Sequence, residues 1–189
     1  MDMTILTELG ERVAARYERA NYDHLALSRI ATEELESTAL PALDLEGLTT
    51  FVARGAVSQR PDESFGDLPA IVFSRPQFYI QLLVWNHSTT SIHEHAFSGA
   101  FKVLAGSSIH ARYRFHPAKA LNANLKVGEA TLEDVELLET GAVRPIIAGH
   151  DTLMHSLFHL EQPSATVVVR NHSVASAQPQ YALAKPHFA

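Results

Sequence analysis

The sequence predicts a mainly β fold, a closed barrel or jelly roll, with a helical segment at its N-terminus. In the first third of the chain, apolar residues recur every three or four positions, which is the period of an amphipathic helix. From Ala70 the period becomes two, and about eight short strands separated by turns follow. Such a set of strands is typical of barrels and jelly rolls. The 189 residues fit one structural domain, with a helical part and connector at 1–69 and a barrel at 70–189.

Three helices are expected in the N-terminal part. One apolar stripe predicts a helix over 4–19 and consists of Ile5, Leu6, Leu9, Val13 and Tyr17. A second helix is predicted over 23–37. A third, short helix begins near Leu45 and ends before Gly55. The residues from Gly55 to Pro69 are rich in Gly, Pro, Ser and Asp, which predicts a connector.

The barrel strands are expected at 80–85, 92–104, 109–115, 125–127, 135–138, 143–147, 153–160 and 165–170. A bend is predicted at Ser98-Gly99, within the second of them. In the third, Ile109 and other apolar residues alternate with polar ones. We therefore expect the apolar side chains to face the core, and His110 and His116 to lie at an exposed strand edge.

Composition excludes several classes of function. The chain has no cysteine, so disulfides, thiolate ligands, iron-sulfur clusters and a cysteine nucleophile are ruled out, and any metal must bind to His, Asp or Glu. A net charge of −6 argues against a nucleic-acid partner. No apolar run has the length of a membrane helix, and the N-terminus lacks the order of a signal peptide, so a cytoplasmic protein is expected.

Two histidines two residues apart are the strongest chemical signal. On a strand, alternate side chains share a face, so His93 and His95 would direct both imidazoles into one volume. Neutral imidazole suits iron, zinc, copper and nickel ions. The alternative is that the pair binds no metal. The chain has eleven histidines, so two of them can stand at this spacing by chance.

The surrounding residues resemble a known family. Trp85, a short turn and the segment Ser91–Gly106 reproduce a pattern of Ser-Ile-His-acid-His followed by Phe, Lys, Leu and Gly. This pattern resembles the first motif of the cupins, and within them the cysteine dioxygenase group of thiol dioxygenases. The resemblance covers residues 70–170 and implies a double-stranded β-helix barrel. The carboxylate ligand of most cupins would fall on Gly99 or Ala100, so it is missing here. In this the sequence resembles the thiol dioxygenases, whose iron site consists of three histidines alone.

The resemblance implies a third histidine ligand from a later strand. The candidates are His150, His155 and His159, and the motif position favours His155. His159 would share a face with His155, either as a group behind the ligands or as an alternative ligand. The family's active-site Tyr has no clear counterpart here, because Val167–Arg170 occupies that region.

The same resemblance implies Fe(II), dioxygen and a small thiol or similarly small anionic substrate. An arginine upstream of the Trp strand binds the substrate carboxylate in the family, and Arg75 lies in the matching region. Two other functions stay open: a zinc or nickel cupin with a non-redox, sensing or ligand-binding role, and a ligand-binding barrel that has lost its metal. The residues from Pro117 to Pro145 are expected to form a lid or an extra hairpin, and a homodimer is possible.

Overall fold

The computed structural model describes residues 3–59, 66–87, 89–148, 154–172 and 178–183. Its helices are α1 (Thr4–Arg19), α2 (His24–Ser37) and α3 (Leu45–Ala53), which confirms all three predicted helices. Its strands are β1 (Leu68–Ser74), β2 (Phe78–Trp85), β3 (Ile92–His93), β4 (Gly99–Ala105), β5 (Ser108–Asn122), β6 (Leu125–Leu138), β7 (Val143–Ile146), β8 (Met154–His159), β9 (Ser164–Asn171) and β10 (Gln180–Tyr181). The mainly β prediction is therefore confirmed. Within the described part, none of the helices is long and apolar enough to cross a membrane.

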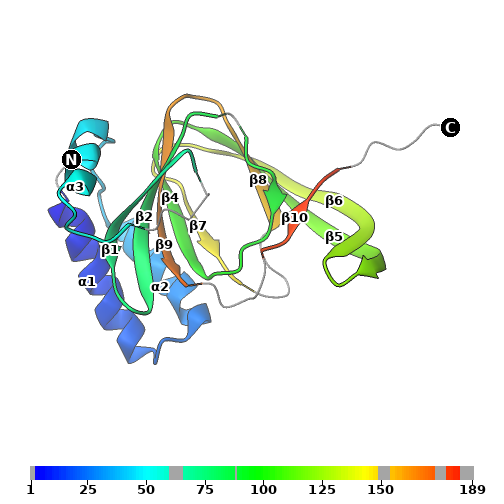
Figure 1. Cartoon of the computed structure of the whole chain (residues 1–189), viewed down its shortest axis with the longest axis horizontal. Coiled ribbons are helices and arrows are strands. Elements are labelled where there is room, and N and C mark those ends of the chain that lie inside the picture. Colours follow the sequence, from blue (N-terminus) through cyan, green and yellow to red (C-terminus); the bar gives the residue numbers. More distant parts are fainter. Residues whose placement is uncertain (1–2, 60–65, 88, 149–153, 173–177, 184–189) are drawn as a thin grey trace.

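The strands from β2 to β9 pair in a nested order, as the two arms of one long hairpin would. β5 pairs with β6, β4 with β7, β3 with β8 and β2 with β9, all antiparallel. This nested pairing produces two five-stranded sheets, in the orders β1-β2-β9-β4-β7 and β10-β3-β8-β5-β6. Figure 1 shows the two sheets enclosing a barrel, with the helices on the outer side of the first. The arrangement is that of the expected double-stranded β-helix, or jelly roll.

The first sheet is buried on both faces. Every residue of β2 is buried, because alternate side chains face opposite layers. Ile80 and Leu82 pack against the helices, whereas Leu83 and Trp85 face the barrel interior. The same alternation holds in β9, where Val167 joins the helical layer. A sheet covered on both sides explains why these strands are continuous apolar runs.

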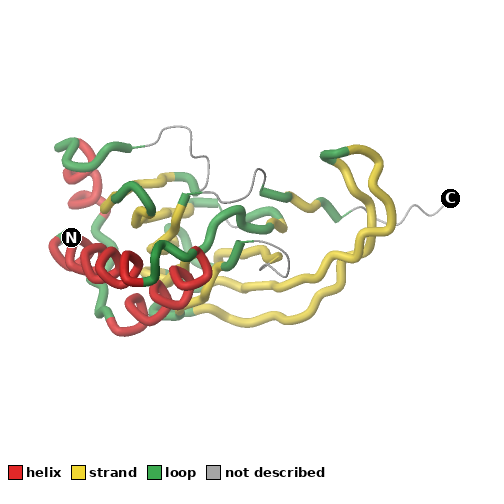
Figure 2. The backbone as a smooth tube through the Cα atoms, turned by 90° about the horizontal axis from the view of Figure 1, so that it is seen from below, coloured by secondary structure: helices red, strands yellow, loops and turns green. Residues whose placement is uncertain are grey.

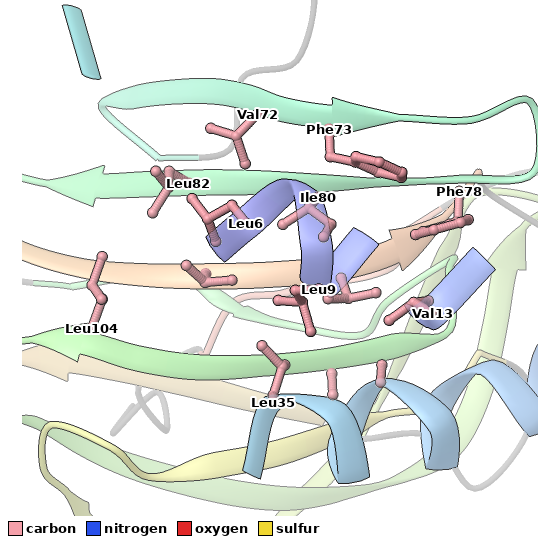
Figure 3. Packing of buried hydrophobic residues seen from close by; sticks show 14 of the residues in the cluster. Leu6, Leu9, Val13, Leu35, Val72, Phe73, Phe78, Ile80, Leu82 and Leu104 are labelled. Carbon is pink, nitrogen blue, oxygen red and sulfur yellow. The ribbon is translucent and has the colours of Figure 1, made fainter. Parts of the chain in front are cut away.

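The helices pack on the first sheet, and two of them, α2 and α3, begin at capping aspartates. The side chain of Asp23 accepts a hydrogen bond from the backbone N–H of Leu25 at 2.9 Å, at the start of α2. Apolar side chains of α1 and α2 fill the layer between helices and sheet, as Figure 3 shows. The ammonium group of Lys102 in β4 donates to the carbonyl oxygens of Leu35 and Thr38, each at 2.8 Å, and ties the sheet to the end of α2.

A long hairpin of β5 and β6 leaves the barrel. The two strands have 15 and 14 residues and run outward from the body of the molecule (Figure 2). The extra hairpin was one of the two expectations for the segment between Pro117 and Pro145. The two short strands predicted at 125–127 and 135–138 are parts of the single strand β6. The hairpin residues near the barrel contribute to the interior, and those beyond it are mostly exposed.

Candidate metal centre

Three histidines meet inside the barrel. His93 of β3 and His155 of β8 are register partners, and His95 follows β3 directly. One ring nitrogen from each lies within 4.8 Å of the other two. The side chains are buried, with 1%, 5% and 2% of the surface of His93, His95 and His155 exposed. The predicted ligands are therefore brought together by the pairing of β3 with β8, although His95 and His155 are 60 residues apart in the chain.

Two of these rings are fixed by their other nitrogen. Nδ1 of His93 lies 2.7 Å from the carbonyl oxygen of Ser91. A carbonyl only accepts, so Nδ1 carries the hydrogen and Nε2 keeps its lone pair. Nδ1 of His155 lies 2.8 Å from Nε2 of His110, which leaves Nε2 of His155 directed to the cluster. Nε2 of His155 and Nε2 of His95 are 2.9 Å apart.

Burial keeps the cluster neutral. Desolvation lowers the pKa of His93, and it lowers the pKa values of His95 and His155 well below the ordinary value. The neighbouring rings lower the last two further, and the charge of Arg170 also lowers the pKa of His95. Neutral imidazoles at neutral pH are the form that binds a metal ion, so the donor set fits a divalent transition metal.

No carboxylate joins the cluster among the described residues, and the backbone explains why. A Cβ at Gly99 would overlap the carbonyl oxygen of Val169 and lie 2.9 Å from its carbonyl carbon. Ala100 is fully buried in the layer facing the helices, on the other side of the sheet from the cluster. Neither position can direct a Glu side chain at the three histidines, so the ligands that the described residues supply are all neutral.

Three polar side chains, connected by hydrogen bonds, lie on the side of His155 that faces away from the cluster. His110 in β5 is fully buried, and its Nδ1 lies 2.9 Å from Oε1 of Glu136 in β6. The same carboxylate binds the guanidinium of Arg144 in β7 through both of its oxygens. Arg144 lowers the pKa of Glu136 to about 2, with a further contribution from the His110 hydrogen bond, although partial burial opposes the shift. Glu136 is thus a carboxylate over the whole physiological range.

The cluster opens into a small, mostly apolar cavity. The volume of the cavity is about 30 Å³. Its walls consist of the three histidines with Gln81, Leu83, Trp85, Phe97, Phe101, Ile146, Leu157, Thr166, Val168 and Arg170. Nε1 of Trp85 lies 3.4 Å from Oγ1 of Thr166, which places the indole in the wall. A space of this size holds about one or two water-sized molecules beside the three rings.

Arg170 is the cationic side chain in this wall. Its guanidinium carbon lies 3.6 Å from the centre of the Phe97 ring and 5.2 Å from that of Tyr79. Both distances are within the range of cation–π attraction, so the two rings hold the charge in place. A guanidinium held beside neutral metal ligands can bind a carboxylate or a similar anion.

The other predicted site residues lie elsewhere. Arg75 is not in the cavity wall: its guanidinium pairs with Glu11 and lies 4.6 Å from the Phe73 ring centre. His159 is buried, stacks on Trp85 with centroids 5.0 Å apart, and contacts the hydroxyls of Ser108 and Ser164 through Nδ1. It therefore lies behind the cavity wall and outside the cluster. His150 falls outside the described residues.

Sequence reasoning missed His110, Glu136, Arg144 and Arg170. The expectation of an exposed His110 is wrong, because its side chain faces the interior whereas Ile109 is 40% exposed. The sequence indicates the alternation of apolar and polar residues in β5. On that basis the apolar residues, Ile109 among them, are expected on the side facing the core. At this point a partly buried acceptor, Glu136, pairs with His110, and the polar face is the inner one. The exposed position predicted for His116 is confirmed.

Comparisons with known proteins give similarity of fold only. No family model matches the chain, and no curated protein matches it. A cupin-2 domain protein of Shewanella frigidimarina is 12% identical, with 69% of this chain and 94% of that one covered and a TM-score of 0.39. A double-stranded β-helix protein of Klebsiella pneumoniae is also 12% identical, with 68% and 93% covered and a TM-score of 0.40.

Two enzymes are also similar in structure. A DMSP lyase is 16% identical with a TM-score of 0.40, and the match covers 60% of this chain and 52% of the lyase. A hydroquinone 1,2-dioxygenase with bound Cd²⁺ is 16% identical with a TM-score of 0.39, and 55% and 63% of the chains are covered. The chain thus spans about half of the lyase and under two thirds of the dioxygenase. Identities and scores of this size carry no argument about activity.

Proposed function

We propose that the protein is a non-haem Fe(II)-dependent dioxygenase that oxidises a small thiol to a sulfinate, with His93, His95 and His155 as metal ligands. The observation that carries the proposal is a set of three buried imidazoles beside an arginine, with no carboxylate from the described residues. Three neutral ligands leave the ion its full charge and open positions, which suits an anionic thiolate together with dioxygen.

When bound, Fe(II) supplies the redox chemistry by which both oxygen atoms of dioxygen are added to the thiolate sulfur. The overall reaction joins a thiolate and dioxygen into a sulfinate, so atoms and electrons balance and no external reductant is needed. The protein contributes binding, orientation and exclusion of water. His93 and His155 present Nε2 lone pairs, because Ser91 and His110 fix their Nδ1 hydrogens.

The remaining wall residues define the substrate. Arg170 binds a second anionic group of the thiol, such as a carboxylate, in the role that the sequence resemblance implied for Arg75. The cation–π contact with the Phe97 ring, at 3.6 Å, keeps the guanidinium at the cavity wall. Phe101, Ile146 and Val168 surround the reacting atoms with apolar surface and keep water away from the sulfur. A small cavity with one fixed cation favours a short, anionic thiol.

The proposal is tested by oxygen uptake. Purified protein loaded anaerobically with Fe(II) is mixed with cysteine, mercaptopropionate, cysteamine or mercaptosuccinate, and oxygen consumption and sulfinate are measured. We expect at least one thiol to consume one dioxygen per sulfinate formed. His93→Ala and His155→Ala should lose both the bound iron and the activity, whereas His116→Ala, an exposed histidine, should keep them. Iron-loaded protein that oxidises none of these thiols would overturn the thiol assignment.

A zinc or nickel cupin without redox chemistry is the second candidate. Three histidines with an open fourth position also form hydrolytic zinc sites, and the neutral, buried donor set favours zinc equally well. Metal analysis of protein produced without added metal separates the two candidates. Stoichiometric zinc that persists after incubation with Fe(II) would support this candidate, whereas iron or an exchangeable site supports the dioxygenase.

A further inference from the structure

His155 is connected by hydrogen bonds to a carboxylate that does not touch the metal cluster. The path runs from Nδ1 of His155 to Nε2 of His110 at 2.8 Å, and from Nδ1 of His110 to Oε1 of Glu136 at 2.9 Å. Arg144 binds both oxygens of Glu136 and lies at the end of the path. The four residues come from β8, β5, β6 and β7, so the path crosses four strands in space.

The hydrogens along this path can be placed in only one way for neutral rings. A carboxylate held by Arg144 only accepts, so Nδ1 of His110 must donate to it. Nε2 of neutral His110 then has a lone pair and must accept from Nδ1 of His155. Nε2 of neutral His155 is left with its lone pair, and this is the atom that points to the other two histidines. Glu136 thus determines, through one intervening ring, which nitrogen of His155 can bind a metal.

The three ligands differ in this respect. His93 is fixed by a backbone carbonyl, that of Ser91, which no side-chain substitution removes. Nε2 of His95 faces Nε2 of His155, which can only accept, so His95 carries its hydrogen at Nε2 when no ion is bound. In His155, the nitrogen that faces away from the cluster is held by a side chain, that of His110. Removal of that side chain should therefore affect the metal site without changing any ligand.

We infer that His110 is a positioning residue, held by Glu136 and Arg144, that fixes the ring and the tautomer of His155 for metal binding. Hydrogen bonding of this kind also raises the basicity of the ligand, and its loss costs about tenfold to a hundredfold in metal affinity in other metal sites. The inference rests on the metal site of the proposed function, but not on iron or on a thiol substrate.

The hairpin offers a matched control for a variant of this path. Arg112 and Asp134 are register partners in β5 and β6, and they also form an ion pair. Arg112 lies two residues after His110 in β5, and Asp134 lies two residues before Glu136 in β6. Their side chains are 47% and 46% exposed, so they form a comparable pair outside the barrel. Asp134→Asn and Glu136→Gln make the same chemical change at these two places.

Co(II) is a suitable probe, because its visible absorption reports ligand geometry and needs no turnover. Co(II) and Zn(II) affinities are measured by competition with a chelator for the wild type, Glu136→Gln, His110→Leu, His110→Gln and Asp134→Asn. We expect His110→Leu to bind about tenfold to a hundredfold more weakly, with a shifted Co(II) spectrum. Glu136→Gln loses the charge but keeps one acceptor oxygen, so its affinity should lie between those of His110→Leu and the wild type. His110→Gln, whose amide oxygen can still accept from His155, should recover part of the affinity, and Asp134→Asn should equal the wild type. Circular dichroism verifies that each variant is folded.

The outcomes separate this inference from the proposed function. If Glu136→Gln and His110→Leu are folded and bind Co(II) within twofold of the wild type with an unchanged spectrum, the positioning role is overturned. If His110→Leu does not fold, Glu136→Gln and His110→Gln decide the question by the same criteria. A wild type that binds no divalent ion would overturn both proposals. A wild type that binds Co(II) as expected but oxidises no thiol would overturn the dioxygenase and leave the positioning role supported.

Discussion

Gly99 and Val169 lie so close together that no side chain fits between them: a Cβ at Gly99 would overlap the carbonyl oxygen of Val169. The two residues belong to β4 and β9, which pair in the middle of the first sheet. This contact removes one of the two positions from which a carboxylate could reach the three histidines. At Gly99, backbone packing itself therefore excludes a carboxylate ligand.

Gly99→Ala should be strongly destabilising. The added methyl group meets backbone atoms, which cannot move aside as a flexible side chain does, so we expect a loss of at least about 2 kcal/mol in the free energy of unfolding. Urea denaturation of the wild type and the variant measures the difference. A variant as stable as the wild type would show that β4 and β9 are further apart than described.

Gly10→Ala should also destabilise, against the usual effect in a helix. Alanine normally stabilises a helix by about 1 kcal/mol relative to glycine. Here a Cβ would lie 2.5 Å from the Phe73 ring, where α1 meets β1, so we expect a net loss of about 1–3 kcal/mol. Phe73→Leu provides the control, because Gly10→Ala should cost less in that background. Equal costs in both backgrounds would contradict this contact.

Arg170→Gln should impair substrate binding more than metal binding. Loss of a guanidinium bound to an anionic group costs about 1.5–3 kcal/mol, so the KM for an anionic thiol should rise at least about tenfold. Arg75→Gln is the matched control, because Arg75 pairs with Glu11 outside the cavity and should leave KM unchanged. Steady-state oxygen uptake with both variants, each loaded with iron, checks the prediction. The opposite ranking of the two variants would restore the role first expected for Arg75.

Acid should destabilise the protein between pH 6.5 and pH 4 through His159. Burial lowers the pKa of His159 from 6.5 to about 4. In this range the unfolded chain binds a proton at this position and the folded protein does not, so the free energy of unfolding falls as the pH falls. His159→Gln, which can still accept from Ser108 and Ser164, should show a shallower fall. Urea midpoints at pH 7, 6, 5 and 4 measure both slopes, and parallel slopes would refute the assignment.

Much of the site followed from local sequence, although the predicted strand over 92–104 is divided: β3 ends at His93, and His95 lies in the segment between β3 and β4. The spacing of His93 and His95 places both rings on one side of the chain, and the structure brings His155 to them. The three helices were also predicted, since the recurrence of apolar residues every three or four positions is a local signal.

The residues behind the ligands were not predictable in the same way. His110 and Glu136 meet only because β5 pairs with β6 in one register, and this register depends on the whole hairpin. The alternation in β5 was visible, but nothing local states which of its faces is the inner one. Arg170 was seen only as part of an apolar run, and its position beside Phe97 depends on the fold of the barrel.

The sheet formed by β1, β2, β9, β4 and β7 has a practical consequence, because its outer face is as apolar as its inner one. A fragment cut to begin at residue 70 would expose the side chains that now contact α1 and α2, Ile80, Leu82 and Val167 among them. Such a truncated product should aggregate during expression. The helices are therefore needed wherever the barrel is to be handled in solution.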